Sequence, residues 1–278
     1  QKFERHAYDY SDNHFFVSLD YRENNVRGEN VYESYYNYAA YGKTMPVLLR
    51  PDLQILDMEV WITRPASSGS ATDPAERPGV AFIDMAGFEY TSDLSDSVKK
   101  YADPTLNVES QSGIVEVGNF KQMKKDVEYT YNQTTGILTL KQSVQEDQVI
   151  AVAYRVSGTP GPNKYYGTFV NNPRLEQISA NPRLVLKLVK PKTLSPSFKQ
   201  AWKHRVRSIY SLNMRNMKKE DLANFKIVYR SGGTPENETV LNTGRKWIQL
   251  FGLDNTDDAG GARGDDRIDF LEAVTVNS

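Results

Sequence analysis

The chain has 278 residues and carries 34 Lys and Arg against 35 Asp and Glu, so its formal net charge is -1. This balance provides no overall field to attract a polyanion, and we therefore predict that nucleic acid is not a partner. Cysteine is absent, which excludes disulfides, thiolate metal sites and cysteine nucleophiles. A hydrophobic share of 39% is enough for one large domain or two of ordinary size.

The sequence contains no apolar run of the roughly 18 residues needed for a transmembrane helix. Its first residues, Gln-Lys-Phe-Glu, do not resemble a signal peptide. Because the sequence begins at Gln1 and not at Met, we expect it to be a piece of a longer protein.

The first half of the chain alternates between strand-like and irregular segments. Apolar patterning predicts strands over 14–19, 56–63 and 80–84, with a helix over 29–42 between the first two. In the second strand, Leu56, Met58, Val60 and Ile62 are expected to share one face. We predict a long exposed loop over 64–79, which contains three Pro and two Gly, and an irregular connection over 89–118.

The second half begins with a predicted hairpin over 126–141, whose turn spans Asn132 to Gly136. Residues 148–156 are apolar at nearly every position, as in a strand that is covered on both faces at the centre of a sheet. Further predicted elements are a strand over 183–190, a helix over 195–209 with Ser195 as N-cap, a strand over 224–230, and two strand candidates at 246–254 and 267–274.

These elements predict an α+β fold class, with strand-rich mixed sheets, two βαβ-like units and few helices. The two strand–helix–strand units span residues 14–63 and 183–230. For domains we predict an N-terminal α+β unit at 1–125, with the loop 64–79 and the irregular 89–118, and a C-terminal β-rich α+β unit at 126–278. The alternative is one continuous domain.

An acidic, glycine-rich loop occupies residues 252–270. Asp254, Thr256, Asp258 and Asp265 fall at positions one, three, five and twelve of an EF-hand-like calcium frame. The frame has Ala259 where the sharp turn needs glycine, and Asp265 where it needs a bidentate Glu. We therefore predict a solvated turn between two strands, with calcium binding as the minority alternative, and we assign no metal ligand.

No catalytic constellation stands out. None of the three histidines, His6, His14 and His204, has metal-ligand spacing. We interpret His14 as a strand end and His204, which lies among Lys203, Arg205 and Arg207, as part of a solvated helix face. The G-x-S-x-G and phosphate-loop motifs are absent. We predict no enzyme activity, no catalytic or cofactor-binding residues, no cofactor and no small-molecule substrate; a hydrolase with a dispersed triad is a remote alternative.

Tyrosine is the unusual residue, with 17 copies, five of them within residues 32–41. Tyr-rich surfaces bind protein or sugar well, because the ring supplies contact area at low entropic cost and the hydroxyl supplies a hydrogen bond. This composition favours a binding or structural module. A stand-alone surface adhesin or carbohydrate-binding module, with Trp61 against a sugar ring, is the alternative function.

An ordered set of segments resembles one protein family. In chain order they are DMEVWITR with VAFIDM (57–64 and 80–85), YNQTTGILTLKQSVQEDQVIAVAYRV (131–156), LVLKLVKPKTLSPSF with RSIYSL (184–212), and FKIVYR, LFGLDNTDD and DDRIDF (225–270). This set resembles the Sov/SprA family, the giant outer-membrane translocon of the type IX secretion system, which also serves gliding motility in Bacteroidetes.

The resemblance implies a non-enzymatic, extra-membrane domain of a protein-export channel that shapes the cargo exit path and docks partner proteins. The implied partners are the parent β-barrel, other secretion-system proteins and secreted cargo. The implied location is associated with the outer membrane at the cell surface, with the extracellular face favoured over the periplasm. The acidic loop departs from the family pattern, because DAGGARGDDRIDF replaces a Pro-Asp-Gly turn.

Overall fold

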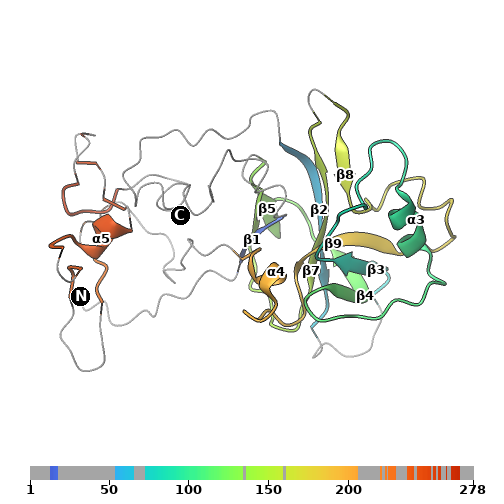
Figure 1. The fold of residues 1–278 in the computed structure, drawn as a ribbon, viewed down its shortest axis with the longest axis horizontal. Helices are drawn as coiled ribbons and strands as arrows, with labels where there is room; N and C mark the ends of the chain where they lie inside the picture. Colours follow the sequence, from blue (N-terminus) through green and yellow to red (C-terminus); the bar gives the residue numbers. More distant parts are fainter. Residues whose placement is uncertain are drawn as a thin grey trace. The chain divides into compact units, whose positions relative to one another are not determined.

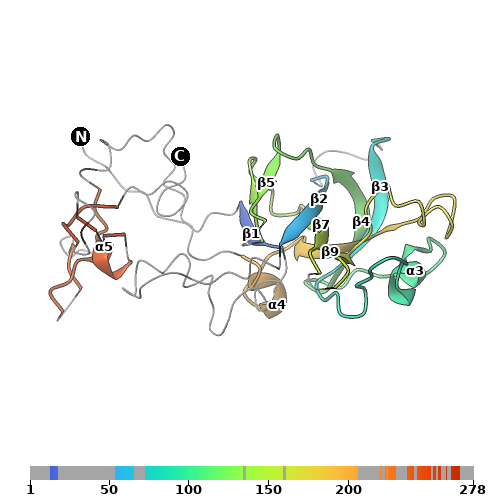
Figure 2. The ribbon, with the colours of Figure 1, turned by 90° about the horizontal axis from the view of Figure 1, so that it is seen from above.

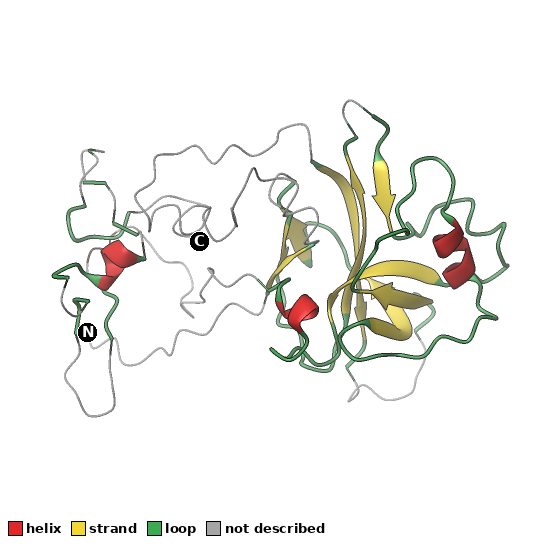
Figure 3. Cartoon of the chain, in the orientation of Figure 1, coloured by secondary structure: helices red, strands yellow, loops and turns green. Residues whose placement is uncertain are grey.

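The computed structural model describes residues 13–17, 54–65, 73–133, 136–158 and 161–205, together with parts of 220–269. The described residues up to 205 form one compact unit, and those from 220 onward belong to a second unit. Strands outnumber helices (Figure 3), and parallel and antiparallel pairing both occur. The predicted α+β class, strand-rich with mixed sheets and few helices, is confirmed.

In chain order the elements are β1 (His14–Phe16), β2 (Ile55–Thr63), β3 (Glu76–Phe82), α3 (Asp96–Ala102), β4 (Val115–Gln122), β5 (Tyr129–Tyr131), β6 (Ile137–Leu140), β7 (Ile150–Val156), β8 (Lys164–Tyr166), β9 (Leu184–Lys190), α4 (Lys199–Trp202) and α5 (Trp247–Leu250).

Five strands close into a ring of backbone hydrogen bonds. β2 pairs with β4 and β7, β3 pairs with β4 and β9, and β9 pairs with β7. The β3–β9 pairing is parallel and the other four are antiparallel. β8 adds to β7 outside the ring, and β1, β6 and β5 form a separate three-stranded sheet. Closure pairs strand edges that would otherwise be open to other chains.

Two apolar cores lie on opposite faces of β7. Ala151 and Ala153 belong to the first core, which also contains residues of β3, β9 and α3, whereas Ile150 and Val152 belong to the second core, shared with β2, β5 and β6. Accordingly, α3 and the three-stranded sheet lie on opposite sides of β2 and β7 (Figures 1 and 2). The prediction of a central strand covered on both faces is therefore confirmed.

The alternation predicted for β2 is confirmed in part. Met58 and Val60 lie in the second core, and Trp61 faces the first core on the other side of the strand. Leu56 is exposed, because the register with β7 shifts between Ile55 and Asp57. Such a bulge reverses the face on which the following side chains lie, so the simple alternation fails at this residue.

The predicted hairpin and the strand at 183–190 are also confirmed, as β5 with β6 and as β9. The turn between β5 and β6 is closed by the N–H of Gly136, which donates to the carbonyl of Asn132 at 2.9 Å. Gly136 has a φ of 68°, a conformation that favours glycine.

Two predictions for the first half are wrong. β3 begins at Glu76, inside the predicted loop 64–79, and the supposedly irregular 89–118 contains α3 and the start of β4. Pro78 is compatible with a strand because pairing of β3 with β9 begins only at Gly79. A Cβ atom at Gly79 would approach the Phe120 ring to 2.9 Å, so this glycine allows β3 and β4 to pack closely.

Neither βαβ-like unit has its predicted form. β1 and β2 belong to different sheets, and the helix predicted at 29–42 lies outside the described residues. In the second unit, residues 225–228 carry no strand, and α4 begins at Lys199 because Ser195 to Phe198 form a turn. Strands from both predicted domain ranges, 1–125 and 126–278, pair in the one ring.

Replacing the fully buried Leu186 of β9 with Ala should lower the free energy of unfolding by about 3 kcal/mol, because the substitution leaves a cavity in the first core. Urea titration followed by tryptophan fluorescence measures the change. Leu56→Ala is the matched control in the same unit, and its effect should stay below about 1 kcal/mol because Leu56 is exposed. Equal losses for both variants would contradict the assignment of β9 to the core.

Candidate functional site

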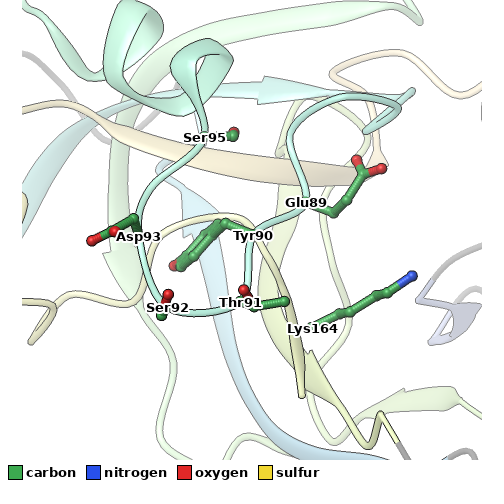
Figure 4. A pocket seen from close by; sticks show the side chains of 7 residues that line it. All are labelled: Glu89, Tyr90, Thr91, Ser92, Asp93, Ser95 and Lys164. Atoms are coloured by element: carbon green, nitrogen blue, oxygen red, sulfur yellow. The ribbon is translucent and has the colours of Figure 1, made fainter. Parts of the chain in front are cut away.

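A pocket of about 290 Å³ lies between the segment that precedes α3 and the start of β8 (Figure 4). Glu89 and Lys164 extend toward the same side of the pocket in this view, and the Tyr90 ring lies between them and Asp93. The pocket is lined by Glu89, Tyr90, Thr91, Ser92, Asp93, Ser95 and Lys164. Its size suits a small group or one or two side chains.

The Tyr90 ring that lines this pocket belongs to an aromatic stack. The rings of Tyr90 and Tyr165 are nearly parallel, with centroids 5.2 Å apart, and Phe169 meets Tyr165 edge to face at 5.9 Å. The Arg155 guanidinium lies over the Tyr165 ring at 5.9 Å. Such contacts add to area burial and fix ring orientation, so the pocket has a rigid base.

The Tyr90 hydroxyl joins this stack to the segment before β9. It donates to the carbonyl of Gly167 at 3.0 Å and accepts from the Asn172 amide at 3.4 Å. Burial raises the pKa of Tyr90 to about 12, so the phenol remains a protonated donor at neutral pH. Gly167 adopts a φ of 80°, and a Cβ there would meet the Val185 carbonyl at 2.9 Å.

Glu59 of β2 holds the same segment from the other side. One of its carboxylate oxygens accepts the backbone N–H of Val170 at 3.0 Å. Burial raises the pKa of Glu59 above its ordinary value, although the Val170 N–H favours the charged form. The segment 167–172 is therefore anchored by the buried Tyr90 and by the half-buried Glu59 of β2.

The groups that line the pocket differ in their availability. Asp93 forms an ion pair with Arg174, and the Ser95 hydroxyl accepts the Val98 N–H as the N-cap of α3. The side chains of Glu89 and Lys164 have no hydrogen-bond or ion-pair partner within the described part of the chain, and both residues are exposed. A carboxylate and an ammonium group are thus available to a ligand.

Carboxylates within the acidic loop accept hydrogen bonds from other residues of the same loop. The buried Asp254 accepts the backbone N–H groups of Asp265 and Asp266 at 2.8 and 3.1 Å, and Asp269 accepts the Thr256 hydroxyl at 2.7 Å. Burial raises the pKa of Asp254. Of the predicted calcium frame, Asp258 and Ala259 lie outside the described residues, and the described part contains no group of carboxylates or histidines arranged to hold a metal.

The secondary structure on either side of the acidic loop also differs from the prediction. Residues 247–250, expected in a strand, form the short helix α5, whose N-terminus is closed by reciprocal hydrogen bonds between Lys246 and Gln249. Residues 267–269 carry no strand, and 270–274 lie outside the described residues. The predicted turn between two strands is therefore wrong for the described residues.

The remaining residues singled out from the sequence have mostly structural positions. His204 is 1% exposed, and its Nδ1 lies 3.0 Å from the Gln200 carbonyl, so its assignment to a solvated helix face is wrong. His14 opens β1 as predicted, and burial lowers its pKa. Trp61 is 1% exposed, so it offers no face to a sugar ring. His6 and the tyrosines at 32–41 lie outside the described residues.

The sequence contains one weak signal for the pocket, at Glu89 to Thr91. Glu89, Tyr90 and Thr91 alternate between exposed, buried and exposed, as in a short edge strand. The segment contains too few apolar residues to be distinguished from a loop.

No family model matches the chain, and no curated protein matches it either. Among the described helices, none combines the length and hydrophobicity needed to cross a bilayer.

Replacing Glu59 with Gln should change how stability depends on pH. Because the pKa of Glu59 is raised in the folded state, protonation stabilises the fold below its ordinary pKa, and this contribution is lost as pH rises through the folded value. The Gln variant should lack this loss. Its stability relative to the parent should therefore increase as the pH rises from about 4 to about 7, the range in which a carboxyl group with a raised pKa titrates.

Urea midpoints measured across this range provide the comparison. Glu109→Gln, which changes an exposed glutamate of the same unit, is the matched control and should leave the pH profile unchanged. Parallel profiles for the parent and Glu59→Gln would show that Glu59 is not held in the buried position described.

Proposed function

We propose that this chain is a non-enzymatic, extra-membrane domain of an outer-membrane protein-export channel of the Sov/SprA type, which serves type IX secretion and gliding motility. In this role it shapes the path by which cargo leaves the channel and docks partner proteins. Its partners are the parent β-barrel, other secretion-system proteins and the cargo. We place it on the extracellular face of the outer membrane in preference to the periplasm.

One observation carries the proposal: the segments that resemble the family overlap four of the five strands that build the ring, β2, β3, β7 and β9. Residues 57–64 and 80–85 cover most of β2 and the end of β3, 131–156 cover β6 and β7, and 184–212 begin with β9. Buried strands are the places where a fold restricts residue type most strongly. An ordered resemblance at these positions therefore supports a shared architecture more than the same matches in loops would.

The arrangement of the ring is compatible with a structural and docking role. Its strands are fixed by two cores on opposite faces of β7, and closure provides a rigid body whose loops can meet other proteins. The exposed Glu89 and Lys164 at the pocket add a charged surface. The carbohydrate-binding alternative depended on Trp61, which is buried.

The proposal is tested in the full-length protein that contains this chain. Deleting residues 54–205 should cause secreted proteins to accumulate inside the cell, while the parent protein remains in the outer membrane. Quantitative mass spectrometry of culture medium and membrane fractions measures both quantities. Insertion of an epitope after Asn107, an exposed residue of a described loop, is the control and should leave secretion intact.

The same epitope tests the location. Antibody binding to intact cells is expected for a domain on the extracellular face, whereas binding only after the outer membrane is opened would assign the domain to the periplasm. Normal secretion in the deletion strain, with the parent protein present, would refute the export role whatever the location.

A further inference from the structure

The segment before α3 extends the sheet beyond β8. Tyr90 and Tyr165 exchange two backbone hydrogen bonds, from Tyr165 N to Tyr90 O at 2.7 Å and from Tyr90 N to Tyr165 O at 3.1 Å. In an antiparallel pair, the hydrogen-bonding groups of successive residues point to opposite sides of the strand. The Glu89 C=O and the Thr91 N–H, which share peptide planes with the Tyr90 N–H and C=O, therefore point away from β8.

These two backbone groups are unpaired within the described part of the chain. Glu89 and Thr91 make no backbone hydrogen bond there, and both are exposed, whereas Tyr90 between them is buried. Both residues also line the pocket, whose lining extends to Lys164 of β8 (Figure 4). An open row of donors and acceptors at a sheet edge is a template for another strand.

We infer that the edge formed by Glu89 and Thr91 binds an extended peptide segment of a partner protein by strand addition. A peptide residue opposite Glu89 would donate its N–H to the Glu89 carbonyl, and a peptide residue opposite Thr91 would accept the Thr91 N–H, as in other complexes formed by strand addition. The bound segment becomes the next strand after β8 and the Tyr90 bridge.

The charges around the edge select the peptide. The antiparallel bridge between Tyr90 and Tyr165 places Thr91 beside Lys164 and Glu89 beside Tyr166, with Glu89, Thr91 and Lys164 on one exposed face. Opposite charges on directly paired residues stabilise a sheet and like charges destabilise it. A basic residue is therefore favoured directly opposite Glu89. An acidic residue is favoured opposite Thr91, because the flexible Lys164 side chain on the other side of Thr91 can reach across it.

An antiparallel partner meets these requirements with the sequence acidic–x–basic. The intervening residue lies on the side of the Tyr90 and Tyr165 stack, which favours an apolar side chain there. This inference does not rest on the proposed export role, because the edge, its charges and its stack are present in the chain itself.

The test uses the 278-residue chain and two capped peptides, Thr-Glu-Val-Lys-Thr and its charge-swapped isomer Thr-Lys-Val-Glu-Thr. Amide NMR spectra during titration should show saturable shifts at Glu89, Thr91 and the adjacent residues of β8 with the first peptide. The dissociation constant is expected on the order of 1 mM, because the contact is short. The swapped peptide should bind about three-fold more weakly.

Two variants separate backbone pairing from charge. Thr91→Pro removes one N–H of the edge and should abolish binding, whereas Thr91→Val retains the N–H and should bind as the parent does. Retention of the Tyr165 amide signal in Thr91→Pro shows that the Tyr90 bridge is intact. Glu89→Lys needs no change of backbone and should reverse the preference between the two peptides.

Three results would overturn the inference. The first is the absence of shifts at Glu89 and Thr91 at peptide concentrations well above 1 mM, the order of the expected dissociation constant. The second is unchanged binding by a folded Thr91→Pro variant. The third is equal affinity for both peptides in the parent and in Glu89→Lys, which would show that the edge does not read charge. None of these results depends on the outcome of the secretion experiment.

Discussion

The pairing of β2 with β7 is the constraint on which the remaining architecture depends. It joins residues nearly a hundred positions apart, with registers from Ile55 with Val156 to Ile62 with Ile150. β2 also pairs with β4, and β7 with β9, so this one contact turns an open sheet into a ring. Without it, β7 would lose its neighbouring strand β2, whose side chains contribute to both cores. The two cores would then no longer be separated by a continuous layer.

β9 shows how the ring accommodates charge in its interior. Its sequence, LVLKLVK, is buried throughout, including Lys187 and Lys190. The Lys190 ammonium donates to the carbonyls of Glu146 and Gln148 at 2.8 and 2.7 Å, and two further backbone carbonyls lie within 3.3 Å. A buried ammonium is tolerated only when its donors are satisfied, so Lys190 also fixes the loop that leads into β7.

Local patterning predicted the elements whose signal is contained in their own residues. β7 and β9 are continuous apolar runs, and the hairpin of β5 and β6 is marked by its turn. β4 was missed because VEVGNFKQ has a glycine at its centre and few buried residues; pairing with β3 along its length holds it in a strand. The short α5 was predicted as a strand because its apolar residues do not reveal the cap made by Lys246 and Gln249.

The candidate site was harder to predict, since its parts come from segments that are distant in sequence. Tyr90 and Tyr165, which are 75 positions apart in the chain, form a stack and a bridge, and Glu59 of β2 reaches Val170. The sequence identified tyrosine as the unusual residue but pointed to positions 32–41, where the local density is highest. Density along the chain does not predict which rings meet in space.

The position of the open edge follows from the way the ring closes. β7 pairs with β2 along its length on one side, but on the other side it pairs with β9 only over Ile150–Val152 and then with β8 over Tyr154–Val156. The ring is therefore complete at one end of β7, while at the other end β8 continues the sheet outward. Tyr90 covers one residue of β8, and its neighbours Glu89 and Thr91 remain exposed. Because closure pairs the edges elsewhere in the ring, the capacity to add a strand is concentrated where β8 departs from it.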